Sequence, residues 1–283
     1  MKIESLSCAA LLSFSFFIGD LTAFSSLEDE YTPRYCLQLE AAYGKGMMSE
    51  GGSEGIEFMF DQIPLNHKVA LDIGSGLGGV AFYLAETYSM RITGLEVNPW
   101  MIAEAQKQTP AHLSEQVDFL LSTSNSHWPI PDENYDIIYS KGVLTHLENK
   151  NELLQECHRL LKKDGIFVIT DWLSAETKQW GENISKLIEL EHLALFPESK
   201  SGYLELLQKN GFTLLSVRDD SLAYLRFNKA ICERLQAAML TRTLSDIFEE
   251  KELQASIDGY QSIAKALEMG ELKVFRFVVQ KDF

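Results

Sequence analysis

The chain has 283 residues, of which 46% are hydrophobic and 23% are charged, so it can bury a sizeable globular core. Its formal net charge of −16 at pH 7 disfavours binding to a phosphate backbone, and we expect no nucleic-acid partner. The four cysteines show no C-x-x-C spacing, which predicts reduced, mostly buried thiols of a cytoplasmic protein rather than a disulfide or zinc framework.

Residues 1–27 form an apolar N-terminal segment that differs in composition from the rest of the chain. The run Ser7–Ile18 is too short to span a bilayer. Glu4 weakens the positive region that a secretory signal needs, and no small-x-small cleavage site follows. We expect an extra packing helix. The alternative is an exported or membrane-associating segment, and membrane contact then requires that the segment be retained and exposed.

Strands and helices alternate over residues 28–283, which predicts one domain. Short apolar runs predict the strands His67–Ile73, Arg91–Glu96, Val117–Leu121, Tyr135–Ser140, Gly165–Asp171, Thr213–Asp219 and Lys273–Gln280. Helical patterns predict the helices Gly79–Thr87, Met101–Gln108, Lys150–Leu161 and Ser201–Asn210. This alternation predicts an α/β fold with a doubly wound, mostly parallel seven-stranded sheet.

Two kinds of segment interrupt this alternation. Lys162–Gly165 predicts a helix stop, with lysines in the last turn and a glycine after it. The stretches near 175–200 and 221–271 look helical, and we expect them to be lid insertions over an active site. Ile231 and Leu235 share one apolar helix face in the second stretch, and core packing is the preferred interpretation of that face.

The most informative segment is Val69–Gly79, an apolar strand that ends at Asp72 and opens into a glycine-rich turn. Gly74 and Gly76 allow a tight turn and the close approach of a ligand that a Cβ would exclude. The glycine spacing also satisfies the dinucleotide pattern G-x-G-x-x-G. The carboxylate of Asp72 would repel a pyrophosphate but suits the ammonium group of S-adenosylmethionine. We therefore favour S-adenosylmethionine over NAD as the cofactor.

A second acid, Glu96, ends the next predicted strand, 18 residues after Gly78. An acid about 20 residues beyond such a glycine turn accepts hydrogen bonds from ribose hydroxyls. The position therefore supports a nucleoside ligand. A solvated residue at the end of the strand is the alternative interpretation.

Three segments resemble the class I S-adenosylmethionine-dependent methyltransferases, namely Leu71–Gly79, Tyr135–Ser140 and Gly165–Asp171. More narrowly, Tyr31–Gly52 resembles the N-terminal region of phosphoethanolamine N-methyltransferases, and the likeness extends to the C-terminus. The resemblance implies a Rossmann-like class I fold and the cofactor S-adenosylmethionine. It also implies that the methyl acceptor is a small molecule, and we expect the methylated atom to be the nitrogen of a small amine or phosphobase. We expect a monomer without a metal site.

The resemblance also implies roles for individual residues. Tyr31 and His146 match the tyrosine–histidine pair that organises the family's active site. The implied cofactor-binding residues are Ser49, Asp72, Gly74, Gly76, Glu96, Val97, Ser124, Asn125 and Lys141. The implied substrate-binding residues are Tyr43, Met48 and Trp172.

Methylation of an amine gives the tyrosine–histidine pair a chemical purpose. An alkylamine of pKa about 10 must lose a proton first, which at pH 7 costs about 4 kcal/mol at roughly 1.36 kcal/mol per pKa unit. A histidine can accept that proton, and a tyrosine hydroxyl can fix the geometry. The alternative for His146 is a residue at the start of a helix whose hydrogen bonds are all made to nearby groups. The alternative for Tyr31 is an ordered tyrosine on the surface.

Several positions depart from the family pattern and bear on the acceptor. Gly142 stands where the family has an aspartate that contacts the amine, and Ser124 stands where an acid lies near adenine. Trp172 replaces a tyrosine, and residues 173–200 contain no arginine and no tyrosine, although the family's phosphate clamp uses both. These departures disfavour phosphoethanolamine and favour a small amine, or a cationic or zwitterionic acceptor.

Other functions stay open beside this interpretation. The first is a C- or O-methyltransferase that acts on a lipid or quinone precursor. The second is a catalytically silent S-adenosylmethionine-binding protein, which the departures at Ser124 and Gly142 would allow. A nicotinamide dehydrogenase is a further alternative that Asp72 disfavours.

Overall fold

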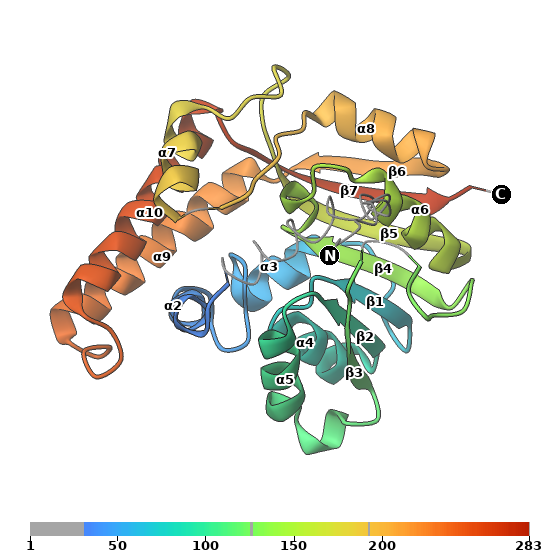
Figure 1. The fold of residues 1–283 in the computed structure, drawn as a ribbon, viewed down its shortest axis with the longest axis horizontal. Coiled ribbons are helices and arrows are strands. Elements are labelled where there is room, and N and C mark those ends of the chain that lie inside the picture. Colours follow the sequence, from blue (N-terminus) through green and yellow to red (C-terminus); the bar gives the residue numbers. More distant parts are fainter. Residues whose placement is uncertain (1–30, 125–126, 192, 283) are drawn as a thin grey trace, which may run out of the picture.

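The computed structural model describes residues 31–124, 127–191 and 193–282. The predicted N-terminal segment 1–27 and the predicted site residue Asn125 lie outside the described residues. Within them, seven strands form one sheet in the order β3-β2-β1-β4-β5-β7-β6, with helices packed against it (Figure 1).

The sheet confirms the predicted doubly wound architecture. Its strands are β1 (Val69–Ile73), β2 (Arg91–Glu96), β3 (Val117–Leu121), β4 (Tyr135–Lys141), β5 (Leu161–Leu173), β6 (Phe212–Asp219) and β7 (Lys273–Lys281). The strands β1 to β5 pair in parallel, whereas β7 runs antiparallel to both of its neighbours, β5 and β6. Because β1 lies between β2 and β4, the chain reverses its winding direction there, and a ligand crevice is expected at this point.

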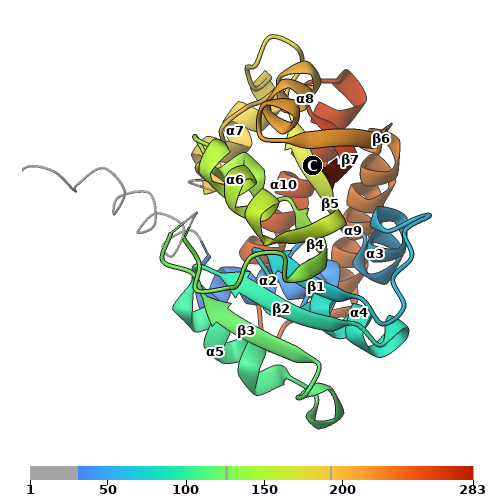
Figure 2. The same cartoon turned by 90° about the vertical axis from the view of Figure 1, so that its right-hand side faces the viewer.

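Helices cover both faces of the sheet. They are α2 (Pro33–Tyr43), α3 (Gly52–Met59), α4 (Gly79–Tyr88), α5 (Pro99–Gln108), α6 (Asn151–Leu160), α7 (Glu182–Glu191), α8 (Lys200–Lys209), α9 (Ser221–Thr241) and α10 (Glu250–Met269). Leu71 and Ile73 of β1 join the core that includes residues of α6 and α8, whereas Ala70 joins the core of α3, α4 and α5. Figure 2 shows α6 and α3 on opposite sides of the sheet. Burial on both faces explains why the central strands β1 and β4 are rich in apolar residues.

Some boundaries differ from the prediction for local reasons. His67 has a φ of 58°, which is incompatible with an extended strand, so β1 begins at Val69. The helix α6 ends at Leu160, so Lys162 lies beyond its last turn, and Asp164 rather than a glycine takes the left-handed conformation. Within the described part of 175–200, the helix α7 begins only at Glu182.

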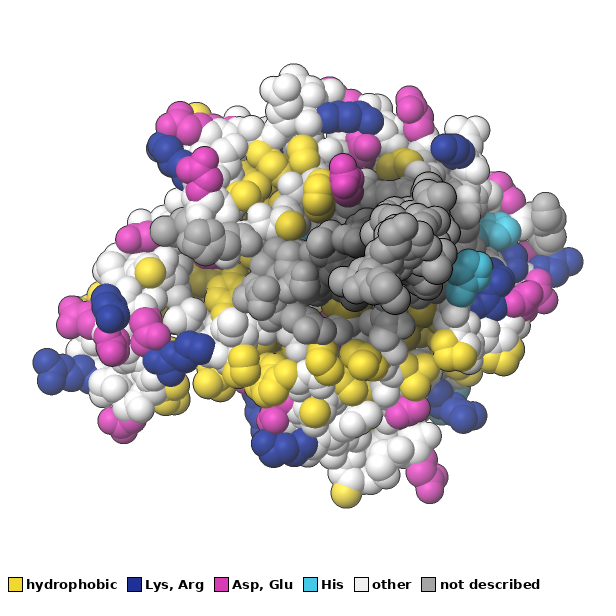
Figure 3. All heavy atoms as spheres, in the orientation of Figure 1, with side chains coloured by type: hydrophobic (Ala, Val, Ile, Leu, Met, Phe, Trp, Pro, Cys, Tyr) yellow, Lys and Arg dark blue, Asp and Glu magenta, His cyan; other side chains and the backbone are white. Residues whose placement is uncertain are grey.

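The helices α7, α9 and α10 form a separate layer at the end of the sheet where β5 ends and β7 begins, and they pack on α2 (Figure 1). Ile231 and Leu235 are almost fully buried there, so the predicted apolar face packs in the core of this layer. Acidic and basic side chains are mixed over its outer surface (Figure 3). No helix among the described residues is both long and apolar enough to cross a membrane. Cys36, Cys157 and Cys232 are free and buried, as predicted.

Candidate functional site

A cavity of about 350 Å³ lies at the carboxyl ends of the central strands, and we call it the strand-end cavity. Its lining comes mainly from the segments that follow four parallel strands. These lining residues include Gly74 and Gly76 after β1, Glu96, Val97 and Asn98 after β2, Ser122 and Ser124 after β3, and Lys141 to Val143 after β4. The cavity therefore occupies the crevice expected at the reversal point of the sheet.

The glycine turn forms one wall of the strand-end cavity. Gly74 has a φ of +69°, and a Cβ on it would lie 2.5 Å from a methyl carbon of Val143. Gly76 has a φ of +54°, and its Cβ would lie 2.7 Å from the Cγ of Met48. The backbone N–H groups of Gly74 and Ser75 both donate to the Leu95 carbonyl oxygen. Only glycine fits this fixed turn, because any side chain would be strained and would clash.

Glu96 connects the glycine turn to the end of β2. Its Oε2 accepts a hydrogen bond from the Gly76 N–H at 2.9 Å, and its Oε1 accepts from the N–H groups of Val97 and Asn98 at 2.8 and 3.0 Å. Burial raises the pKa of Glu96, and the backbone hydrogen bonds oppose that change. A carboxylate has about four acceptor positions, so this one retains capacity for a ribose hydroxyl.

The rest of the strand-end cavity fits a nucleoside. Val97, Met101 and Leu147 supply apolar surface for a base. Ser122 and Ser124 take part in hydrogen bonds with the indole N–H of Trp128. The lining thus offers one buried acid, an apolar wall and a glycine cradle, which together suit the nucleoside of S-adenosylmethionine.

Asp72 occupies a different position from the one that the sequence suggested. It is 4% exposed, pairs in register with Tyr139 of β4, and lines neither this cavity nor the second one described below. Burial raises the pKa of Asp72 well above the usual carboxyl range. A direct contact between Asp72 and a cofactor therefore stays a prediction.

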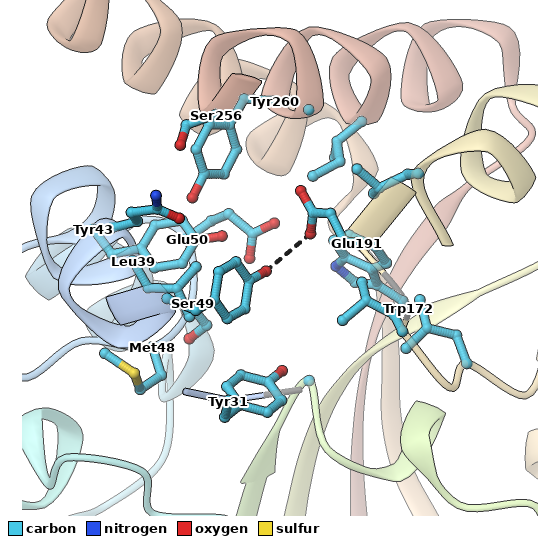
Figure 4. A pocket seen from close by; sticks show the side chains of 18 of the residues that line it. Tyr31, Leu39, Tyr43, Met48, Ser49, Glu50, Trp172, Glu191, Ser256 and Tyr260 are labelled. Atoms are coloured by element: carbon cyan, nitrogen blue, oxygen red, sulfur yellow. Dashed lines mark hydrogen bonds between the residues drawn. The ribbon is translucent and has the colours of Figure 1, made fainter. Parts of the chain in front are cut away.

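A second cavity of about 630 Å³ lies beside the first, and we call it the helix-side cavity (Figure 4). It lies between α2, α7 and α10, and the loop before α3 and the ends of β4 and β5 complete it. Its aromatic lining residues are Tyr31, Tyr35, Tyr43, Trp172 and Tyr260. The predicted substrate residues Tyr43, Met48 and Trp172 all lie here.

The two cavities meet at five shared lining residues, Tyr31, Met48, Lys141, Gly142 and His146. The Tyr31 hydroxyl and the His146 Nε2 are 3.4 Å apart, and their rings meet edge to face. Burial lowers the pKa of His146 to about 4, although a hydrogen bond with the backbone of Ala194 partly opposes this change. The imidazole is therefore neutral at pH 7, and it lies beside the Tyr31 hydroxyl group at the junction.

Lys141 anchors the loop before α3. Its Nζ donates to the Ser49 Oγ at 2.6 Å and to the Glu50 carbonyl oxygen at 2.7 Å. Burial lowers the pKa of Lys141 to about 8. Ser49 lines the helix-side cavity and not the strand-end cavity, although the resemblance placed it among the cofactor residues.

Sequence reasoning did not identify several polar residues of the helix-side cavity. Tyr35 donates from its hydroxyl to the Glu191 Oε2 at 2.9 Å. Glu50 and Tyr260 also line this cavity. Glu50 adjoins the predicted residue Ser49, which was a usable signal. Glu191 and Tyr260 lie on helices for which the sequence showed only helical periodicity.

Residues 71–169 match the protein family described as "Methyltransferase domain". The chain is 30% identical over 167 residues to a phosphoethanolamine N-methyltransferase of Plasmodium falciparum, and the match covers 57% of this chain and 60% of that protein. It is 25% identical over 255 residues to phosphoethanolamine N-methyltransferase 1 of Arabidopsis thaliana, covering 89% of this chain and 50% of the relative. The chain thus spans about half of the length of these curated relatives.

Among solved structures, the fold matches phosphoethanolamine N-methyltransferase 2 of Haemonchus contortus in complex with phosphomonomethylethanolamine and S-adenosylhomocysteine. The TM-score is 0.82 at 17% identity, and the match covers 92% of this chain and 60% of that chain. This likeness confirms the predicted class I fold.

Proposed function

We propose that this chain, which carries a class I S-adenosylmethionine-dependent methyltransferase domain, transfers a methyl group to the nitrogen of a small amine. The observation that carries the proposal is the meeting of two cavities at Tyr31 and His146. One cavity fits a nucleoside, and the other has room for a separate organic molecule. A group transferred between the two ligands would pass this pair.

The strand-end cavity would hold S-adenosylmethionine. Glu96 would accept hydrogen bonds from the ribose hydroxyls, and Val97 would pack beside the adenine. The bound cofactor supplies a methyl group on a sulfonium, which a nucleophile takes in an in-line displacement. The residues of this chain must therefore bring an acceptor nitrogen to the junction with its lone pair directed at that methyl group. The acceptor must react as the neutral amine, with its proton already released to solvent, and S-adenosylhomocysteine is the leaving group.

Tyr31 and His146 are suited to orient such a nitrogen. In the tautomer whose Nε2 carries no proton, the neutral imidazole accepts a hydrogen bond from the Tyr31 hydroxyl group, and the phenolic oxygen can then accept a hydrogen bond from an amine N–H. This contact would turn the nitrogen lone pair away from Tyr31 and towards the cofactor. Orientation of this kind contributes up to roughly 7–11 kcal/mol to a reaction barrier. With a pKa of about 4, His146 acts here by positioning rather than as a strong base.

Turnover and binding assays test the proposal together. Titration calorimetry should detect binding of S-adenosylmethionine and no binding of NAD. Formation of S-adenosylhomocysteine should then require an amine, and we would supply ethanolamine, phosphoethanolamine, glycine or sarcosine. Cofactor binding without turnover of any amine would indicate a silent binding protein, and NAD binding would overturn the assignment of the site.

A second candidate function has one observation in its favour. Leu187, Leu193 and Leu195 form an apolar part of the helix-side cavity, which would suit the body of a lipid or quinone precursor. Carbon or oxygen methylation of such an acceptor would replace the amine reaction. A hydroquinone included in the same turnover assay separates the two functions, because only this second one predicts its methylation.

A further inference from the structure

Two carboxylates face each other across the helix-side cavity. Glu50 extends from the loop before α3, and Glu191 extends from the C-terminal end of α7 on the opposite side (Figure 4). Glu191 accepts the hydroxyl hydrogen of Tyr35, the hydrogen bond drawn as a dashed line in Figure 4. The two acids come from segments 141 positions apart in the sequence, so only the fold brings them together.

Glu50 has an unmet requirement for a hydrogen-bond donor. Its residue is 4% exposed, and its Oε1 is buried without a hydrogen-bond partner in the described part of the chain. An unpaired buried carboxylate oxygen is costly. A cation in the cavity would offset that cost through its charge, and an N–H or O–H group on the same ligand could donate to the oxygen as well.

The charges that line the helix-side cavity do not balance. At its rim, Glu252 pairs with Arg34 at 2.6 Å, and Lys251 pairs with Glu249 at 2.8 Å. Among the described lining residues, the remaining formal charges are those of Glu50, Glu191 and Lys141. Two acids against one base leave one negative charge in excess, and the Lys141 ammonium donates to neutral oxygens.

The aromatic residues of the cavity favour the same kind of ligand. The rings of Tyr43, Trp172 and Tyr260 line the cavity together with the two acids (Figure 4). Aromatic faces attract ammonium groups, most strongly when the groups are desolvated. By contrast, no arginine is present among the described lining residues to form a bidentate contact with a phosphate.

We infer that the helix-side cavity captures its acceptor as a cationic amine that carries no phosphate, with the ammonium group held between Glu50 and Glu191. The amine must then release one proton to solvent before its nitrogen can accept the methyl group beside Tyr31 and His146. This inference rests on the proposed function and specifies its acceptor class. A phosphate ester of the same amine would bring two further negative charges towards the two carboxylates. The cavity should therefore select against phosphorylated acceptors.

A matched pair of probes tests the inference without requiring turnover. Choline and phosphocholine share a trimethylammonium group, differ by one phosphate, and cannot accept another methyl group on nitrogen. We would titrate each probe into the full chain saturated with S-adenosylhomocysteine and follow the heat of binding. Choline should bind at least about tenfold more tightly than phosphocholine, a difference of about 1.4 kcal/mol. Equal or tighter binding of phosphocholine, or no binding of either probe, would overturn the inference.

Isosteric substitutions connect the selectivity to the two acids. Glu50→Gln and Glu191→Gln should each weaken choline binding about tenfold, again about 1.4 kcal/mol. The matched control is Glu205→Gln, which neutralises an exposed glutamate of α8 outside both cavities and should leave choline affinity unchanged. Retained affinity for S-adenosylhomocysteine shows that each variant is folded. Choline affinity unchanged in both cavity variants would overturn the assignment of Glu50 and Glu191.

Failure of this inference is distinguishable from failure of the proposed function. If the chain methylates phosphoethanolamine faster than ethanolamine, the methyltransferase proposal stands and the acceptor class is wrong. If choline binds as expected but no amine is methylated, the binding site stands and the catalytic proposal is wrong.

Discussion

The strand-end cavity and the helix-side cavity are built in different ways. Backbone conformation defines much of the first, through two glycines that allow no side chain and an acid whose two oxygens are occupied by backbone N–H groups. Side chains define the second, and they come mainly from α2, α7, α10, the loop before α3 and the ends of β4 and β5. A geometry set by backbone constrains the sequence strongly, whereas helix-borne side chains can change while the fold is preserved.

The largest expected effect concerns the junction, which belongs to both cavities. Tyr31→Phe and His146→Ala should each reduce kcat/KM for methyl transfer by about 100-fold or more, because both disturb orientation of the acceptor. The affinity for S-adenosylmethionine should change less than about threefold. Steady-state kinetics with calorimetry measures both quantities, and the exposed His112→Ala is the matched control. Equal losses in rate and cofactor affinity would indicate that the pair supports structure in both cavities.

Two acids at the strand ends allow a sharper test within the first region. Glu96→Gln should weaken binding of S-adenosylmethionine about tenfold to 100-fold, because an amide N–H₂ would face backbone N–H donors. Asp72→Asn should weaken it less than about threefold, since Asp72 lines neither cavity. Titration calorimetry measures the affinity of each variant for S-adenosylmethionine. A loss in Asp72→Asn that equals the loss in Glu96→Gln would restore Asp72 to direct cofactor contact.

The pH dependence of stability tests the burial of His146. Its folded-state pKa is about 4 against an ordinary value of 6.5, so the unfolded chain binds the proton first as the pH falls. Stability contributed by the neutral imidazole is fully present above about pH 6.5 and is lost progressively down to about pH 4. The loss is at most about 3 kcal/mol, at 1.36 kcal/mol per pKa unit.

Urea unfolding at pH 7, 6 and 5 measures this loss, with His146→Gln as the reference. The variant should lose less stability than the wild type over this interval, because glutamine does not titrate. Parallel curves for the two proteins would contradict the buried, neutral state of His146.

The smallest expected effect concerns the rim of the helix-side cavity. Arg34 of α2 and Glu252 of α10 form an ion pair at 2.6 Å on an exposed surface. Exposed ion pairs contribute little, so Arg34→Gln should raise the acceptor KM by about twofold or less. At high salt, the difference in acceptor KM between Arg34→Gln and the wild type should be smaller still, because salt screens the ion pair. An effect as large as that of Tyr31→Phe would mean that the rim controls the catalytic geometry.

The contrast between the cavities also explains what the sequence could predict. Gly74, Gly76 and Glu96 were identified from spacing alone, because a turn at a strand end needs those residue types at those positions. The strands β2 and β3 were predicted with their observed boundaries for a related reason, since short apolar runs lie between clear turn signals.

The remaining site residues have no comparable local signal. Periodicity places Glu191 and Tyr260 on helices, but it does not show that α7 and α10 converge on one cavity. The orientation of Asp72 was also unpredictable, because its place at a strand end fits either face of the sheet. Asp72 pairs in register with Tyr139 and lines neither cavity, so its contact with a cofactor stays a prediction.

The side-chain amide of Asn98 links the strand-end cavity to Tyr31 at the junction of the two cavities. The Oδ1 of Asn98 accepts from the N–H groups of Trp100 and Met101 and so caps α5, while its Nδ2 donates to the Tyr31 carbonyl oxygen at 3.2 Å. Asn98 follows Glu96 by two positions, so the segment that would bind the ribose also holds Tyr31, which lies two positions before the start of α2. A substitution of Asn98 should therefore alter the binding of both ligands. Any change in acceptor preference made at this position would also change the affinity for the nucleoside.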